Sequence, residues 1–195
     1  YYIRAILNFD IGNFKGCIGD LDETIRLSRG VENRTRYIFE KIKYLDKMLN
    51  KNRFYVGDVF LGREIENSVE EFLKYKGRLT RYKRQDWVVF SRIMLANALN
   101  WQGKYSEAKD KIDIALTPDN TVDIMKSDSD AGRYFARGFH LKASLVLSLI
   151  DELLIKEELK WVCGFLIQPE ALEEIEQMFE QAESDIKMAD KADRS

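Results

Sequence analysis

The sequence predicts an all-α protein, and three observations support this class. The 195 residues include only 2 prolines and 11 glycines, which is too few turn residues for the many short strands of a β sandwich or barrel. Hydrophobic residues make up 45% of the chain, so it can bury a sizeable core and is not disordered. Apolar residues also recur at helical spacing along most of the chain.

This spacing and the helix-boundary residues predict the helices in chain order. They are expected at 1–8, 15–28, 33–49, 56–75, 84–101, 106–116, 132–155 and 169–189, and 157–166 is expected to be helical as well. The longest expected loop is 117–131, which is rich in Asp, Ser and Thr. Pro169 suits the first turn of the last helix.

The last predicted helix carries an apolar stripe on one side. Its members are Leu172, Ile175, Phe179, Ala182 and Ile186. We expect this stripe to pack on the helix predicted at 132–155. The alternative is that it binds a partner or a second copy of the chain.

The segment 95–116 has the pattern of a helical hairpin. Leu95 and Ala96 fill its first helix, Gly103, Tyr105 and Ala108 form the turn, Ile112 and Ala115 continue the second helix, and Pro118 follows as a breaker. This pattern resembles a tetratricopeptide repeat, a family whose repeats pair two antiparallel helices. Weaker copies of the turn occur at Gly12 and Asn52. Gly103 can adopt the left-handed conformation that ends a helix.

The resemblance implies antiparallel helical hairpins stacked as a right-handed superhelix, an α-solenoid. Its repeats would span 1–30, 36–75 and 84–118, followed by less regular helices over 132–191. We expect one such domain over 1–195, and we interpret the chain as a piece of a larger protein because Tyr1 already lies in a helical pattern. No apolar stretch reaches the ~18 residues of a membrane span. Cys17 and Cys163 lack metal-site spacing, which favours an intracellular, cytoplasmic setting.

The resemblance also implies a concave groove lined by the first helix of each pair. The lining residues would be Tyr2, Phe9, Phe39, Asp46, Asn50, Phe90, Asn97, Asn100 and Trp101. Aromatic anchors beside polar groups that bind an extended backbone are suited to holding a peptide. The alternative is that Ile6, Phe39 and Ile93 simply pack against neighbouring helices. The resemblance therefore implies a protein- or peptide-binding scaffold or adaptor, and it leaves the partner and the oligomeric state open.

A cluster of cations and aromatic residues lies at 74–87, which we name the basic segment. Its cations are Lys74, Lys76, Arg78, Arg81, Lys83 and Arg84, with Tyr75, Tyr82 and Trp87 among them. Cations that meet phosphates beside rings that stack on bases suggest RNA or single-stranded nucleic-acid binding as an alternative function. The same run would also suit a solvated helix end or the docking of an acidic protein. The net charge of −2 argues against nucleic-acid binding by the chain as a whole.

The sequence offers little that suggests catalysis. His140 is the single histidine, and no Gly-rich phosphate loop or nucleophile elbow is present. The run 128–132 departs from a calcium loop because its glycine is one place early and no glutamate stands at the twelfth position. We therefore expect no enzyme activity, no metal and no cofactor. A further alternative is a structural or regulatory segment of a larger enzyme.

Overall fold

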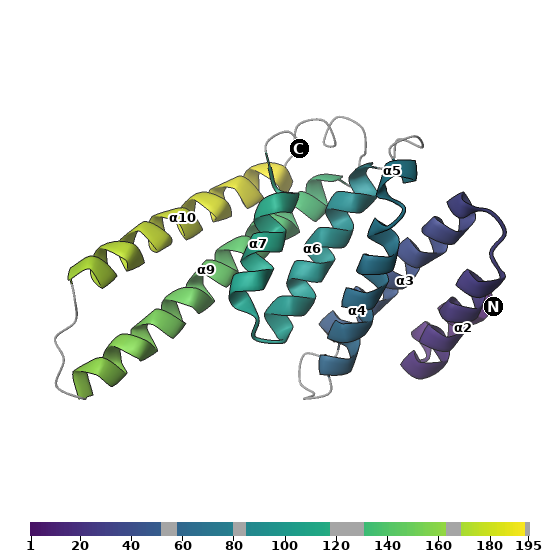
Figure 1. The fold of residues 1–195 in the computed structure, drawn as a ribbon, viewed down its shortest axis with the longest axis horizontal. Coiled ribbons are helices and arrows are strands. Elements are labelled where there is room, and N and C mark those ends of the chain that lie inside the picture. The colour runs from purple at the N-terminus through teal and green to yellow at the C-terminus, as the bar shows by residue number, and fades with distance from the viewer. Residues whose placement is uncertain (52–57, 80–84, 118–130, 163–168, 194–195) are drawn as a thin grey trace. The chain divides into compact units, whose positions relative to one another are not determined.

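A computed structural model describes residues 1–51, 58–79, 85–117, 131–162 and 169–193 (Figure 1). Every secondary-structure element in these ranges is a helix, which confirms the predicted all-α class. The helices up to residue 102 are α1 (Tyr2–Asp10), α2 (Phe14–Leu27), α3 (Val31–Lys51), α4 (Asp58–Leu73), α5 (Lys76–Leu79) and α6 (Gln85–Trp101). After them come α7 (Tyr105–Ala115), α9 (Ala131–Val162) and α10 (Pro169–Asp193). No described helix is long and apolar enough to cross a membrane.

The predicted helix boundaries agree with the observed ones to within a few residues for most helices. Pro169 begins the last helix, as expected from its fixed backbone angle. The largest difference is in α9, where the helices predicted at 132–155 and 157–166 form one helix as far as Val162. Gly12 and Gly103 adopt positive φ angles of 79° and 73° at the predicted turns. The predicted turn at Asn52 and the loop residues 118–130 lie outside the described ranges.

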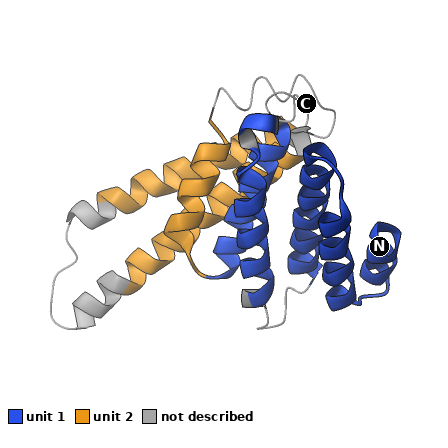
Figure 2. Ribbon diagram, turned by 45° about the vertical axis from the view of Figure 1, so that its right-hand side comes forward, with its two compact units in different colours: residues 1–102 blue, residues 103–195 orange. Residues whose placement is uncertain are grey.

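The chain divides into two compact units, unit 1 at 1–102 and unit 2 at 103–195 (Figure 2). In unit 1, α1 packs on α2, α2 on α3 and α3 on α4, and α6 packs on both α3 and α4. Packing between helices that follow each other in the chain is expected of helical hairpins. Their stacking into a right-handed superhelix, and a single domain over the whole chain, stay predictions.

Aromatic rings link three helices of unit 1. The ring of Phe39 stacks on Trp87 with centroids 4.8 Å apart, and it lies 5.7 Å from the ring of Phe72. These three residues come from α3, α6 and α4, so a single cluster joins three helices. Aliphatic residues such as Leu45 of α3 and Ile65 of α4 are fully buried as well. Burial of this much apolar surface is the main force that holds the helices together.

Unit 2 is built on the antiparallel hairpin of α9 and α10, and α7 packs on α9 (Figure 1). Ala143, Val146 and Ile150 of α9 form a core with Ile175 and Ala182 of α10. The three residues of α9 are separated by three and then four positions, which is the spacing of a coiled-coil seam. Ile175 and Ala182 of the apolar stripe therefore pack on α9 as expected, whereas Phe179 and Ile186 are exposed and the side chain of Leu172 lies outside the described part of the chain.

Candidate functional site

Most of the predicted groove residues lie inside unit 1. Phe9, Phe39, Asp46, Phe90 and Asn97 are buried, Tyr2, Asn50 and Asn100 are half-buried, and Trp101 is exposed. Ile42 and Ile93, which share the same helix faces, are buried too. A side chain enclosed by neighbouring helices cannot also anchor a ligand in the same conformation. The buried members therefore contribute to the core of unit 1. Of the three residues in the alternative interpretation, Phe39 and Ile93 are buried and Ile6 is half-buried.

Two predicted groove residues from different repeats meet inside unit 1. Asn97 Nδ2 of α6 donates a hydrogen bond of 3.1 Å to Asp46 Oδ1 of α3. On α3 itself, Asn50 Nδ2 donates to the backbone oxygen of Asp46 at 2.6 Å. A buried carboxylate is costly unless its oxygens are hydrogen-bonded. The contact between Asn97 and Asp46 therefore helps to fix α6 against α3.

Three lysines follow one side of α3, where Lys47 and Lys51 are exposed and Lys43 is half-buried. Lys43, Lys47 and Lys51 recur every four residues, so they form a row along the helix, which we name the lysine row. Each ammonium lies over an aromatic ring: Lys43 is 5.7 Å from the centroid of Phe39, Lys47 is 5.2 Å from that of Tyr44, and Lys51 is 4.2 Å from that of Phe9. These cation–π contacts restrict the flexible lysine side chains, so the three charges are held in place.

Tyrosines of α1 and α3 continue the surface beyond the lysine row. The rings of Tyr2 and Tyr37 lie 5.4 Å apart, and the Tyr2 hydroxyl donates to Glu40 Oε2 at 3.3 Å. Glu40 Oε1 in turn accepts a hydrogen bond of 2.8 Å from Lys43 Nζ. Burial, together with the Glu40 carboxylate, raises the pKa of Tyr2 to about 12. The Tyr2 hydroxyl therefore keeps its proton at neutral pH and acts as a hydrogen-bond donor.

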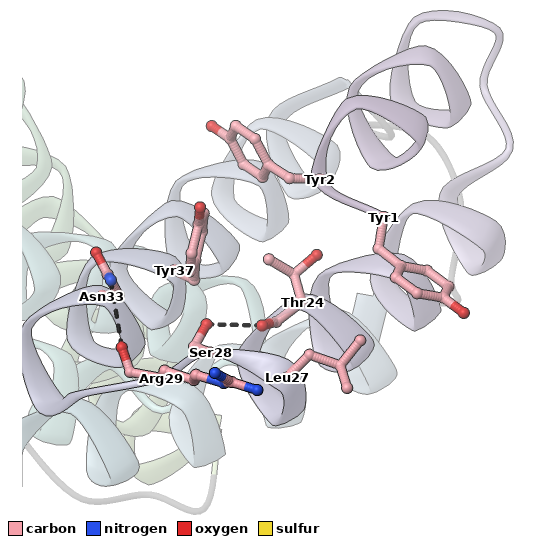
Figure 3. Close-up of a pocket in the computed structure, with 8 residues that line it drawn as sticks. All are labelled: Tyr1, Tyr2, Thr24, Leu27, Ser28, Arg29, Asn33 and Tyr37. Carbon is pink, nitrogen blue, oxygen red and sulfur yellow. Dashed lines mark hydrogen bonds between the residues drawn. The ribbon is translucent and has the colours of Figure 1, made fainter.

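Tyr2 and Tyr37 also line a pocket of about 380 Å³ (Figure 3). Its other lining residues are Tyr1, Thr24, Leu27, Ser28, Arg29 and Asn33. Two hydrogen bonds stabilise the wall of the pocket. Ser28 Oγ donates to the backbone oxygen of Thr24 at 2.7 Å, and Asn33 Nδ2 donates to the backbone oxygen of Arg29 at 3.2 Å. The volume lies at the lower end of the ~300–1,000 Å³ of ligand sites. We name the pocket, Tyr2, Tyr37, Tyr44 and the lysine row together the α1–α3 face.

The lysine row is absent from the predicted groove because the register of the resemblance selects Asp46 and Asn50 on this helix. Its signal is present in the sequence as lysines at i, i+4 and i+8 over 43–51. The rings beneath the lysines could not be predicted in the same way. Phe9 comes from another helix, so its position under Lys51 depends on how α1 and α3 are brought together.

Only part of the basic segment is described. Lys74 and Arg78 are exposed, whereas residues 80–84 and the side chains of 76 and 79 lie outside the described part of the chain. Trp87 is half-buried, and its ring stacks on Phe39 in the core of unit 1. That face of the indole is covered and is not open to a nucleic-acid base. Nucleic-acid binding by the basic segment stays a prediction.

The described residues give little support for catalytic chemistry. They hold no group of three or more His, Cys, Asp or Glu that could bind a metal ion. Cys17 is a buried free thiol, and burial raises its pKa to about 11. A thiol with that pKa is protonated at neutral pH and is a poor nucleophile. His140 is exposed on α9, and Cys163 lies outside the described ranges.

Comparison with protein-family models, with curated proteins and with solved structures finds no match to this chain. The resemblance to tetratricopeptide repeats therefore stays a prediction based on the sequence pattern.

Proposed function

We propose that this chain is a non-catalytic protein-binding scaffold and that the α1–α3 face holds an acidic, extended segment of its partner. The observation that carries the proposal is the lysine row, with its three charges over aromatic rings. Unit 1 as a whole is also positively charged, as the binding of an acidic segment requires. It contains 19 Lys and Arg against 13 Asp and Glu, a net charge of +6.

The spacing of the lysine row suits an extended peptide. Residues four apart in an α-helix are separated by roughly 6 Å along its axis. In an extended strand, side chains on the same side repeat about every 6.6 Å. Acidic residues at alternate positions of the partner would therefore meet successive lysines. The Tyr2 hydroxyl, which donates its proton to Glu40, would accept a hydrogen bond from a backbone N–H of the peptide. The pocket beside it would hold a side chain beyond the acidic run.

A peptide fits this face better than a nucleic acid does. Proteins that bind single strands offer open aromatic rings on which bases stack. Here the rings under the lysine row are occupied by lysine ammonium groups, and Phe9 and Phe39 are buried. Lys47 and Lys51 keep their charges at the exposed surface, whereas Lys43 is paired with Glu40 and the stacking surface is largely covered.

We further infer that the helix pairs of unit 1 form a tetratricopeptide-like stack in an intracellular protein. The sequential packing of α1 to α4 and the positive-φ glycine turns at Gly12 and Gly30 support the stack. The buried free thiol of Cys17 supports a reducing compartment.

A displayed library of random peptides tests the proposed function. Peptides selected on the intact chain should be enriched in Asp and Glu at alternate positions. A triple variant with Lys43→Glu, Lys47→Glu and Lys51→Glu should lose their binding by about 100-fold, since opposite charges become like charges. The matched control carries Lys15→Glu, Lys111→Glu and Lys191→Glu, three exposed lysines elsewhere, and has the same change in net charge.

Equal loss of binding in the lysine-row variant and in the control would show that net charge alone attracts the peptides. That result would contradict a specific site on the α1–α3 face. A homopolymeric RNA serves as a second probe. If the RNA bound the intact chain and the selected peptides did not, the nucleic-acid alternative would replace the proposal.

A further inference from the structure

The α9–α10 hairpin exposes large apolar side chains beside its buried seam. Leu147 and Leu154 directly follow the seam positions Val146 and Leu153 in α9, and Phe179 directly follows Met178 in α10. Ile186 stands seven residues after Phe179, on the same side of α10. Leu147, Leu154, Phe179 and Ile186 are 40%, 42%, 50% and 42% exposed.

These four side chains lie along one edge of the hairpin. In an antiparallel pair of helices, the positions that follow the second core position of each heptad border the same edge of the seam. Leu147 and Leu154 supply this edge from α9, while Phe179 and Ile186 supply it from α10. Along each helix the two residues are roughly 10 Å apart. We name this continuous apolar surface the hairpin strip.

The opposite edge of the hairpin is the one that α7 covers. Lys142 lies on that edge, just before the seam residue Ala143, and its Nζ is 3.0 Å from Asp113 Oδ1 of α7. On the strip side of α9, by contrast, His140, Ser144 and Asp151 are all exposed. Among the residues that the structure describes, no helix of unit 2 covers the hairpin strip.

Carboxylates border the hairpin strip. In the described stretches 147–155 and 173–187, five exposed acidic residues and one lysine lie on the strip side or the outer side of the two helices. The acidic residues are Asp151, Glu173, Glu176, Glu180 and Glu183, whereas Glu152 and Glu174 lie toward the edge that α7 covers. The lysine, Lys187, is 3.0 Å from Glu183. Unit 2 as a whole has 12 Lys and Arg against 20 Asp and Glu, a net charge of −8.

This combination determines the kind of partner. A second copy of the hairpin strip would bring carboxylates against carboxylates, which costs binding energy. A helix with an apolar face flanked by Lys and Arg complements both the apolar side chains and the acidic border. We propose that the hairpin strip docks a basic amphipathic helix of a partner protein. The docked helix would cover Leu147, Leu154, Phe179 and Ile186 and add a third helix to the hairpin. This proposal does not depend on the α1–α3 face, whose charge is opposite.

A labelled synthetic helix with leucine at heptad positions a and d and lysine at e and g is the probe. It should bind the intact chain, and its affinity should fall as salt concentration rises. Two control helices separate the contributions of charge and shape: one has glutamate in place of lysine, and the other has the same composition in scrambled order. Both should bind at least about tenfold more weakly, because each lacks one of the two complementary features.

Variants of the chain locate the binding surface. The double variant Phe179→Gln, Ile186→Gln in α10 should lower the affinity for the synthetic helix with lysine at e and g, the lysine helix, by about tenfold. The double variant Leu147→Gln, Leu154→Gln in α9 should lower this affinity by a similar factor. These side chains lie outside the buried seam, so circular dichroism should show unchanged helix content. Glu176→Gln, Glu180→Gln and Glu183→Gln together should weaken binding and flatten its salt dependence. The matched control is Asp10→Asn, Glu32→Gln and Glu107→Gln, three exposed acidic residues with the same change in net charge.

Three results would overturn the proposal. Unchanged binding of the lysine helix to both glutamine pairs would place its site elsewhere. Equal binding of the scrambled helix would mean that charge alone attracts the probe. If the chain itself formed dimers in sedimentation equilibrium, and Phe179→Gln with Ile186→Gln abolished them, the strip would belong to a second copy.

Discussion

Asn97 joins α6 to α3 through a buried hydrogen bond, and its contribution to stability can be measured. Its buried amide donates to Asp46, so Asn97→Ala leaves a buried carboxylate oxygen without this partner. We expect the free energy of unfolding to fall by about 2 kcal/mol in urea denaturation. Asn100→Ala is the control, because Asn100 is half-buried on the same helix and should change stability by less than about 0.5 kcal/mol. An equal loss of unfolding free energy in Asn97→Ala and Asn100→Ala would mean that the hydrogen bond between Asn97 and Asp46 adds no particular stability.

Lys41 gives a prediction for alkaline pH. Its side chain is 10% exposed, and its Nζ lies 2.7 Å from Asp22 Oδ1 of α2 and 3.0 Å from Glu64 Oε2 of α4. Burial acts to lower the pKa of Lys41, but the hydrogen bonds and charges of both carboxylates outweigh it and raise the pKa above its ordinary 10.5. A folded-state pKa above the unfolded one gives stability that is complete below pH 10.5. This stability is lost as the pH rises through the folded-state pKa.

Lys41→Met should therefore lower the free energy of unfolding at pH 7 by about 2 kcal/mol. The value is below that for a fully buried pair because Asp22 is half exposed to water. The variant should also lose less stability than the wild type between pH 10 and 12, since it has no ammonium to deprotonate. Urea denaturation across this range measures both effects, with Lys47→Met as the exposed control. If the stabilities of the wild type and of Lys41→Met declined equally between pH 10 and 12, deprotonation of Lys41 would not be the cause of the wild-type loss.

At the scale of elements, α1 is held to α2 by a charged contact. Arg4 Nε donates to Asp20 Oδ2 at 2.8 Å, and Asn8 Nδ2 donates to the same oxygen at 2.9 Å. The hydrogen bond from Arg4, with help from its charge and from Asn8, keeps the pKa of Asp20 below its ordinary 3.8. The resulting stability is present above pH 3.8 and is lost as the pH falls through the folded-state pKa.

Hydrogen exchange of the α1 amides measures this attachment. In the wild type, protection of α1 should fall earlier than protection of α3 as the solution is acidified below pH 3.8. Asp20→Asn should reduce the protection of α1 already at neutral pH. The control is Glu23→Gln, which removes an exposed ion pair with Arg26 inside α2 and should leave α1 unchanged. Loss of α1 protection in the control would show that the effect is not specific to the α1–α2 contact.

A buried carboxylate interrupts the apolar seam of the α9–α10 hairpin. Asp185 is 3% exposed, and its Oδ2 has no hydrogen-bond partner in the described structure. Its Oδ1 lies 3.6 Å from Lys142 Nζ, which is nearer to Asp113 of α7. Asp185→Leu should therefore raise the free energy of unfolding of unit 2 by about 1 kcal/mol, because a desolvated charge is replaced by an apolar side chain. Thermal denaturation measures this, and a lower midpoint would mean that Asp185 stabilises the hairpin.

The sequence pattern predicts helices more reliably than it predicts which side of a helix is buried. In α1, Ala5 and Phe9 are buried, whereas Ile3, Leu7 and the following residue Ile11 are exposed. Both sets are separated by four residues, so each supports a helix and neither identifies the inner side. The same ambiguity affected the groove, because the burial of Phe39 and Phe90 depends on distant segments packing together. Local turn residues such as Gly103 were predictable because their backbone requirement is local.

At the scale of the whole molecule, the net charge of −2 conceals two units of opposite sign. Unit 1 carries a net charge of +6 and unit 2 carries −8. The overall composition therefore suggested no particular partner, although the charge of each unit favours a partner of the opposite charge. The division between the units is set by packing rather than by a linker rich in proline or glycine, so it could not be located from the sequence. It falls after Gln102, within the segment that resembles a repeat.

The two units should fold independently of each other. Each has buried residues of its own, with Phe72 and Ile65 in unit 1 and Phe135 and Val146 in unit 2. A domain of about 100 residues buries enough surface on folding to be stable alone. We expect 1–102 and 103–195, produced separately, to be helical and to unfold cooperatively on heating. The first should retain the binding of selected acidic peptides, and the second should retain the binding of the lysine helix. If 1–102 folds but binds no acidic peptide, the α1–α3 face is not sufficient for recognition. If neither fragment folds, the two units form one cooperative structure.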